Sequence, residues 1–167
     1  MRGAMKTSAS DRRQTARTTE VRLAEAKAFW DFAARRLELK ECDRLQQIRT
    51  GLPAHLFQAI RHTFDLEDSG VVLLLNASIS TLQRRVREHQ ALDLVASEGL
   101  DRIALLSCQA EGVFECRDAA AIWLSKRNKA LDGNKPVLVA CEAAVAKYAA
   151  MLAGATIESE ASRHALK

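Results

Sequence analysis

The chain is poor in glycine, proline and aromatic residues. It has seven glycines and two prolines among 167 residues, and only 5% of its side chains are aromatic. Alternating runs of Val, Ile and Thr, which are typical of strands, are nearly absent. These shortages argue against a turn-rich β-sheet protein, and the apolar residues recur at helical spacing. We therefore expect an all-α fold.

Long apolar runs are also missing. The longest aliphatic run is Val71–Leu75, whereas a helix that crosses a bilayer needs about 20 apolar residues. The first 20 residues carry basic side chains but no apolar core segment, which is unlike a secretory signal peptide. The sequence therefore predicts a cytoplasmic protein without a membrane partner, nucleoid-associated if it binds DNA.

The cysteines and histidines do not form a recognisable site. No Cys-x-x-Cys spacing occurs, and no histidine pairs with a cysteine at ligand spacing. Isolated cysteines in a helical cytoplasmic protein usually pack as small apolar residues. We expect no metal, no disulfide and no cofactor. The cysteines are Cys42, Cys108, Cys116 and Cys141.

Motifs of catalysis are absent as well. The sequence has no Ser/His/Asp arrangement, no nucleophile elbow, no glycine-rich phosphate loop and no paired carboxylates on one apolar face. We therefore expect a binding protein and not an enzyme.

The charge is mildly basic and unevenly distributed. A net charge of +4 and a pI near 9.0 permit an anionic partner without requiring one. Residues 1–19 are rich in Ser, Thr and basic side chains, and we expect them to form a disordered head. Two roles stay open for this head, a solubilising terminus and an arm that follows the DNA backbone.

Residues 20–90 form the first helical domain that we expect. A helix begins near Glu20, and its apolar face contains Phe29, Phe32, Ala33 and Leu37. Its solvated face would carry Glu25 among other charged residues. We expect this helix to dock either on the domain or on a second copy of it. Because Phe29, Trp30 and Phe32 are more apolar surface than a small fold readily buries alone, we also predict a homodimer.

The segment Leu66–Val86 indicates two short helices broken at Asn76–Ser78. Ser78 can cap the second helix, whose buried face is marked by Leu82 and Val86. A capped helix after a tight turn is typical of a helix-turn-helix that enters a major groove. An ordinary helical hairpin with a basic solvated face would give the same pattern. The candidate DNA-binding residues are Ser80, Thr81, Gln83, Arg84 and Arg87.

Residues 91–154 form the second helical domain that we expect, followed by a polar tail at 155–167. An apolar stripe starts at Leu100, and Trp123 belongs to an inward stripe of the next helix. The segment Asn128–Lys135 is rich in turn residues, and Pro136 suits the start of a last helix. We expect the intervening loop to be exposed and to contact a partner.

Two sets of residues resemble the Xre/MbcA/ParS antitoxin family. The first is Leu66–Arg85, in which Ser78 is followed by Thr-Leu-Gln-Arg-Arg and Asn76 replaces the usual turn glycine. Gly51-Leu52-Pro53 also resembles the opening of the family's DNA-binding half. The second set keeps the spacing of the family's toxin-binding domain, and the whole resemblance covers about 51–152. This second set is Phe114, Ala120, Ala121, Trp123, Leu124, Asn128, Ala130, Leu131, Gly133 and Pro136.

The resemblance implies a helix-turn-helix domain followed by a small helical toxin-binding domain. It implies an antitoxin of a type II toxin–antitoxin system that blocks a RES-domain toxin, an enzyme that consumes NAD. It further implies repression of the shared operon by a dimer on operator DNA. A stand-alone helix-turn-helix regulator or scaffold without a toxin is the alternative. The toxin contacts that we expect are Asn128, Leu131, Gly133, Lys135, Ile157 and Glu158.

Overall fold

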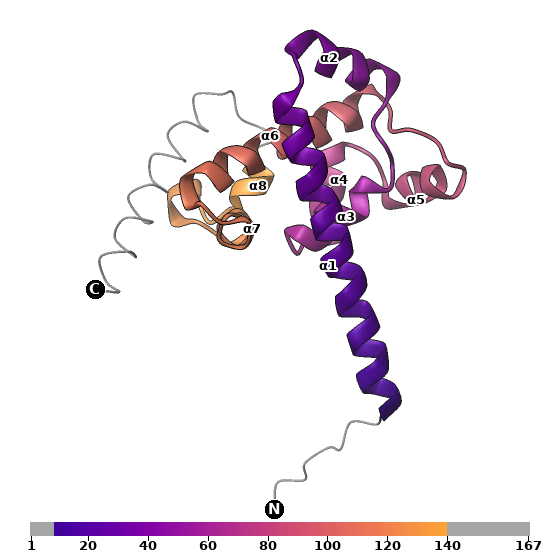
Figure 1. Ribbon diagram of the computed structural model, residues 1–167, viewed down its shortest axis with the longest axis vertical. Coiled ribbons are helices and arrows are strands. Elements are labelled where there is room, and N and C mark those ends of the chain that lie inside the picture. Colours follow the sequence, from indigo (N-terminus) through magenta and orange to yellow (C-terminus); the bar gives the residue numbers. More distant parts are fainter. Residues whose placement is uncertain (1–8, 140–167) are drawn as a thin grey trace, which may run out of the picture.

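The structure is a computed structural model that describes residues 9–139. Its regular elements are all helices, and within this range only two isolated bridges have β pairing. The predicted all-α class is therefore confirmed. The elements, shown in Figure 1, are α1 (Ala9–Glu38), α2 (Glu41–Thr50), α3 (Leu56–Thr63), α4 (Asp68–Leu75), α5 (Ile79–Arg87), α6 (Leu94–Phe114), α7 (Arg117–Ser125), the short 3₁₀ helix η1 (Lys129–Leu131) and α8 (Pro136–Val139).

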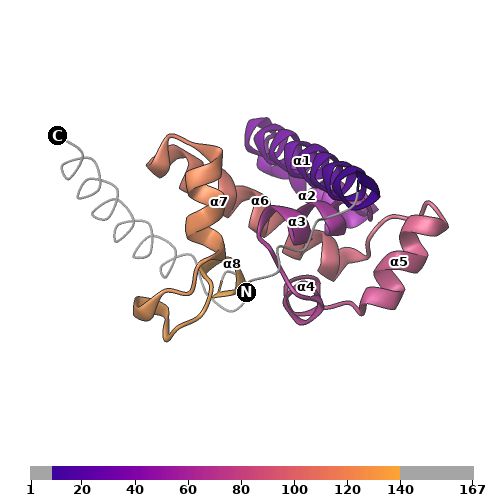
Figure 2. The same cartoon turned by 90° about the horizontal axis from the view of Figure 1, so that it is seen from below.

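Helix α6 is the centre of the fold. It packs against α1, α2, α4 and α7, and Figure 2 shows it between α1 and the α7–α8 pair. Leu100, Ile103 and Ala104 of α6 are fully buried. Buried apolar residues from both halves of the chain belong to one cluster. The boundary that we placed at residue 90 therefore separates α5 from α6 but does not separate two cores.

A glycine allows α4 to approach α6 closely. A Cβ atom at Gly99 would lie 2.4 Å from the carbonyl oxygen of Leu74, which is closer than real Cβ atoms come to any heavy atom. The backbone at the end of α4 therefore lies directly on α6. This contact fixes where the turn to α5 begins.

The aromatic residues of α1 are buried within the chain. Phe29, Trp30 and Phe32 are at most 8% exposed, and the ring of Phe29 meets that of Phe64 edge-on with centroids 5.2 Å apart. Of the two docking partners that we expected for this helix, the structure shows the domain itself, so these side chains do not form a surface for a second copy. The physical reason is that α3 and α6 supply the partners that the isolated helix lacks.

The buried face of α1 is also rotated relative to our expectation. Arg36 is 1% exposed, whereas Leu37 is 62% exposed. Arg36 lies seven residues after Phe29, two helical turns away, so it shares that residue's face. Glu25, expected on the solvated face, is half-buried and pairs with His62 of α3. Polar partners on other helices make both positions possible.

Helix α1 begins earlier than the sequence predicted. It is helical from Ala9, so the prediction of a disordered head was wrong for residues 9–19. Residues 14–24 are all exposed, and Figure 1 shows this end of α1 extending beyond every other described element. The body of the fold holds α1 only from about residue 25 onward.

The second half follows the predicted order as far as Val139. Ala120 and Leu124 of α7 are buried, and Trp123 packs against Phe114 with ring centroids 5.7 Å apart. The predicted last helix begins at Pro136. Its continuation, the end that we expected near 154, and the tail residues Ile157 and Glu158 lie outside the described residues. None of the helices between residues 9 and 139 combines the length and hydropathy needed to cross a bilayer.

Candidate nucleic-acid interface

The break between α4 and α5 is the tight turn that the sequence predicted. Asn76 ends α4 in the left-handed conformation, with φ at +48°. Asparagine adopts this region more readily than most residues do. Val71, Leu74 and Leu75 hold α4 in the core. The turn therefore starts from a fixed helix end.

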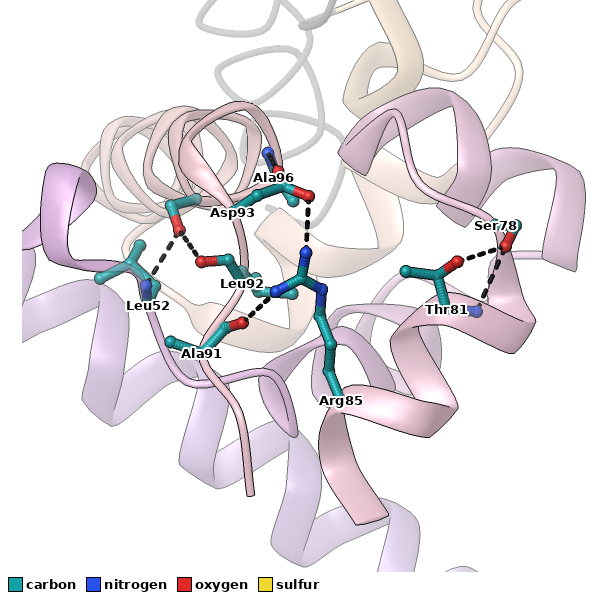
Figure 3. Close-up of polar contacts among 9 residues, drawn as sticks. Leu52, Ser78, Thr81, Arg85, Ala91, Leu92, Asp93 and Ala96 are labelled. Atoms are coloured by element: carbon teal, nitrogen blue, oxygen red, sulfur yellow. Dashed lines mark hydrogen bonds and ion pairs between the residues drawn. The ribbon is translucent and has the colours of Figure 1, made fainter. Parts of the chain in front are cut away.

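Ser78 is the N-cap of α5, as expected. Its Oγ accepts a hydrogen bond from the amide of Thr81 at 3.2 Å, which satisfies one free donor of the first turn (Figure 3). The hydroxyls of Ser80 and Thr81 lie 3.0 and 2.9 Å from the same oxygen. Both candidate residues thus belong to the cap, and Thr81 is also half-buried.

The other candidates share one exposed stripe of α5. Leu82 is fully buried and Val86 partly buried, so the helix has a fixed inner side. Gln83, Arg84 and Arg87 are exposed together with Ser80. Their numbers follow the spacing i, i+3, i+4, i+7, which places them on one face of a helix. The structure brings these four together and leaves Thr81 beside them.

Arg85 has a different role from its neighbour Arg84. Its Nη1 donates to the carbonyl oxygen of Ala91 at 2.7 Å, and its Nη2 lies 3.2 Å from Oδ2 of Asp93 (Figure 3). The other carboxylate oxygen of Asp93 accepts from the amide of Ala96 and caps α6. Arg85 therefore links α5 to the start of the central helix. The sequence alone groups both arginines as one basic cluster.

The segment Gly51–Pro53 fixes the link that follows α5. The amide of Leu92 donates to Leu52 O at 2.8 Å. The amide of Leu52 donates to Ser97 Oγ at 2.9 Å (Figure 3). Gly51 has φ +98°, and a Cβ there would lie 2.5 Å from the Leu92 carbonyl oxygen. This position therefore requires glycine. Together with Arg85, these bonds hold the C-terminal end of α5 and the link to α6.

A hollow lies beside the C-terminal half of α5, and its permanently charged lining residue, Arg85, is paired with Asp93. Its lining includes His55, Arg85, His89 and Gln90 and contains no carboxylate. Such a lining is compatible with a phosphate group next to the exposed stripe. His55 and His89 are the functional candidates that the sequence reading missed, because they lie 34 positions apart in the chain.

The loop between α7 and α8 is closed by its own hydrogen bonds. The Asn128 amide donates to Asn134 O, and the amides of Leu131 and Gly133 donate to Asn128 O, all at 3.0 Å. The side chain of Asn128 accepts from the amide of Ala130. Gly133 adopts φ +77°. The loop is therefore preorganised, as expected of a segment held at both ends.

The expected toxin contacts in this loop have roles inside the chain. Asn128 closes the loop, Leu131 packs partly against the core, and Lys135 Nζ donates to the carbonyl oxygen of Asp65 at 3.0 Å. The exposed residues are others that the sequence reading did not select. They are Lys129, Ala130, Asp132 and Asn134.

The described sites offer groups that can contact a partner. Nowhere between residues 9 and 139 do three His, Cys, Asp or Glu side chains gather closely enough to hold a metal ion. The exposed stripe of α5 offers hydrogen-bond donors and positive charge on a helix whose position is fixed. No protein-family model matches the chain, and no curated protein matches it in sequence.

Proposed function

We propose that α5 enters the major groove of duplex DNA and that the chain represses the operon that encodes it. The observation that carries this proposal is the stripe of Ser80, Gln83, Arg84 and Arg87 on a capped helix. Arg85 and the Leu52–Leu92 pairing hold this helix at a fixed angle to the body. A helix that reads base edges must be held in this way.

The stripe has the donors that groove recognition uses. Arg84 and Arg87 can reach guanine edges or phosphates, and Gln83 can contact adenine. The Ser80 hydroxyl can reach the edge of any base at the start of the helix. The hollow lined by His55 and His89 would lie against the adjacent backbone.

Replacement of Arg84 by alanine tests the base-reading role. If this guanidinium contacts a base, the change should weaken binding to the chain's own upstream DNA by about 1–3 kcal/mol and relax the sequence preference. Lys126→Ala is the control, because Lys126 is exposed at the end of α7, on the opposite side of α6 from α5 (Figure 2). Fluorescence anisotropy with operator and scrambled duplexes measures both. Equal effects of the two variants would exclude α5 as the reading helix.

Dimer formation on DNA belongs to the proposal. A single short helix reads few base pairs, and two linked copies gain effective concentration at a two-fold operator. Light scattering should show a dimer for the free protein and two chains per duplex for the complex. If only one chain binds a duplex that contains both half-sites, the proposed dimer is excluded.

We further propose that the α7–α8 loop and the tail hold a RES-type toxin. The support is a rigid loop that loses little entropy on binding and presents Lys129, Asp132 and Asn134 to solvent. The tail carboxylates, Glu158 among them, suit a basic pocket that accepts the pyrophosphate of NAD. This chain supplies no chemistry to the blockade.

Two variants separate the loop from the tail. Lys129→Glu combined with Asp132→Lys should break the complex without a change in circular dichroism, because both side chains are exposed. Deletion of the residues after Gly154 should release toxin activity even when the complex still forms. If the chain without its tail still neutralises the toxin fully, insertion of the tail into the toxin's pocket is excluded.

A stand-alone regulator is the second candidate function. It predicts the same DNA binding but no toxin. If the adjacent reading frame encodes a RES-type enzyme and this enzyme co-purifies with the chain, the stand-alone regulator is excluded.

A further inference from the structure

Residues 9–24 of α1 form an N-terminal arm that extends from the body of the protein. Residues 14–24 are all exposed, including Val21 at 53% and Leu23 at 67%. A single helix of this length is only marginally stable in water, and most helices in proteins are stabilised by packing. This part of the arm therefore gains little from burial within the chain.

The arm lacks an apolar face. Val21 and Leu23 are two residues apart, so they point to nearly opposite sides of the helix. The other side chains from 14 to 24 are polar, charged or alanine. A helix of this kind suits neither a membrane surface nor a coiled coil, because both need a continuous apolar stripe.

The charge of the protein is concentrated at this end. Residues 1–24 contain six arginine or lysine residues and two acidic residues, whereas residues 25–167 contain nineteen of each. The whole net charge of +4 therefore belongs to the first 24 residues. Arg17 and Arg22 are exposed on the arm, and Arg22 also lies 3.8 Å from Asp65. The body of the protein is electrically balanced.

The arm is on the same side of the molecule as α5. In Figure 2 the N-terminal end of α1 and α5 both lie to the right of α6, and α7 and α8 lie to its left, whereas Figure 1 shows the arm extending downward from the body. At 1.5 Å per residue, the arm is about 24 Å long. A duplex that meets α5 thus has this arm nearby, and residues 9–24 carry four arginines and two acidic residues. DNA carries one negative charge per about 1.7 Å of its axis.

We propose that the N-terminal arm binds the phosphate backbone of duplex DNA without reading its sequence. Charge complementarity supports this contact, which rests on the proposed role of α5 and adds a second contact with the same duplex. The arm supplies affinity and α5 supplies sequence preference. Release of counterions from the phosphates makes the arm's contribution strongly dependent on salt.

The test compares two charge variants of the full chain. The arm variant carries Arg12→Gln, Arg13→Gln and Arg17→Gln. The control variant carries Arg35→Gln, Lys40→Gln and Lys126→Gln, three exposed positions at the far end of α1, before α2 and after α7. Both lose three charges and keep good helix formers. Circular dichroism confirms that each variant is folded.

Anisotropy with operator and scrambled duplexes of about 30 base pairs gives the readout across a salt series. The arm variant should lose about tenfold or more in affinity for both duplexes at 0.1 M salt. Its slope of log K against log[salt] should be shallower by about 2–3. The control variant should match the wild type. A slope that stays unchanged, or changes equally in both variants, would overturn the arm contact.

An Arg84→Ala/Arg87→Ala variant separates this inference from the proposed role of α5. Loss of operator preference in that variant with no effect of the arm variant overturns the arm alone. The reverse result supports the arm and overturns α5. A wild type that binds neither duplex at low salt overturns both. Binding to phosphatidylserine vesicles in place of duplex DNA would also overturn the proposal.

Discussion

Arg36 on α1 and Asp101 on α6 form an ion pair that is almost completely removed from solvent. Arg36 Nε lies 2.6 Å from Asp101 Oδ1, and the two side chains are 1% and 8% exposed. Arg44 of α2 approaches the second oxygen of Asp101 at 3.2 Å, and Gln47 accepts from Arg36 Nη1. One carboxylate thus joins three helices beneath the end of α1.

Replacement of Asp101 by asparagine should destabilise the fold strongly. The change leaves Arg36 buried without a counter-charge, which costs about 3–5 kcal/mol in comparable sites. Urea unfolding measures the loss. Asp31→Asn is the control, because the Lys27–Asp31 pair is exposed and should add little. Similar losses in the two variants would contradict a special role for the buried pair.

Gly99 and Gly112 should respond to alanine with opposite signs. A Cβ at Gly99 meets the Leu74 backbone, so Gly99→Ala should cost about 1–3 kcal/mol. Gly112 lies in the same helix, and a Cβ there would meet no heavy atom within 4 Å, so Gly112→Ala should gain about 0.4–1 kcal/mol. Denaturant midpoints give both values. Destabilisation by Gly112→Ala would show that the local geometry differs.

Asp93→Asn should affect DNA binding more than stability. Asparagine can still cap α6 at Ala96, but it loses the charge that faces Arg85. The Asp93 side chain is 47% exposed, so the loss of stability should stay below about 1 kcal/mol. Operator affinity should fall several-fold because α5 is held less firmly. Unchanged affinity would show that the Ala91 contact of Arg85 is sufficient.

Cys108 should react more slowly with iodoacetamide than Cys42 and Cys116 do. Burial, with a contribution from the nearby Glu111 carboxylate, raises the pKa of the Cys108 thiol above its ordinary value. Less thiolate is then present at mildly alkaline pH, and the thiolate is the reacting form. Cys42 and Cys116 are exposed. Alkylation followed by peptide mass spectrometry across pH gives the order, and equal rates would contradict it.

The sequence by itself determined the features that depend on near neighbours. The helical class, the break at Asn76, the Ser78 cap and the exposed stripe from Ser80 to Arg87 follow from spacing within a few residues. A hydroxyl three positions before an amide, and apolar residues four positions apart, are visible in any helix-forming segment. These elements could therefore be predicted without the fold.

Only the tertiary structure decided which of two similar residues has which role. Arg84 is exposed and Arg85 is bonded because Ala91 and Asp93 return to α5 after the chain turns. Arg36 is buried because Asp101, 65 positions later, lies opposite it. Phe29 and its aromatic neighbours find partners on α3 and α6 for the same reason. Helical periodicity gives the direction of a side chain, but what it meets there depends on contacts between residues far apart in the sequence.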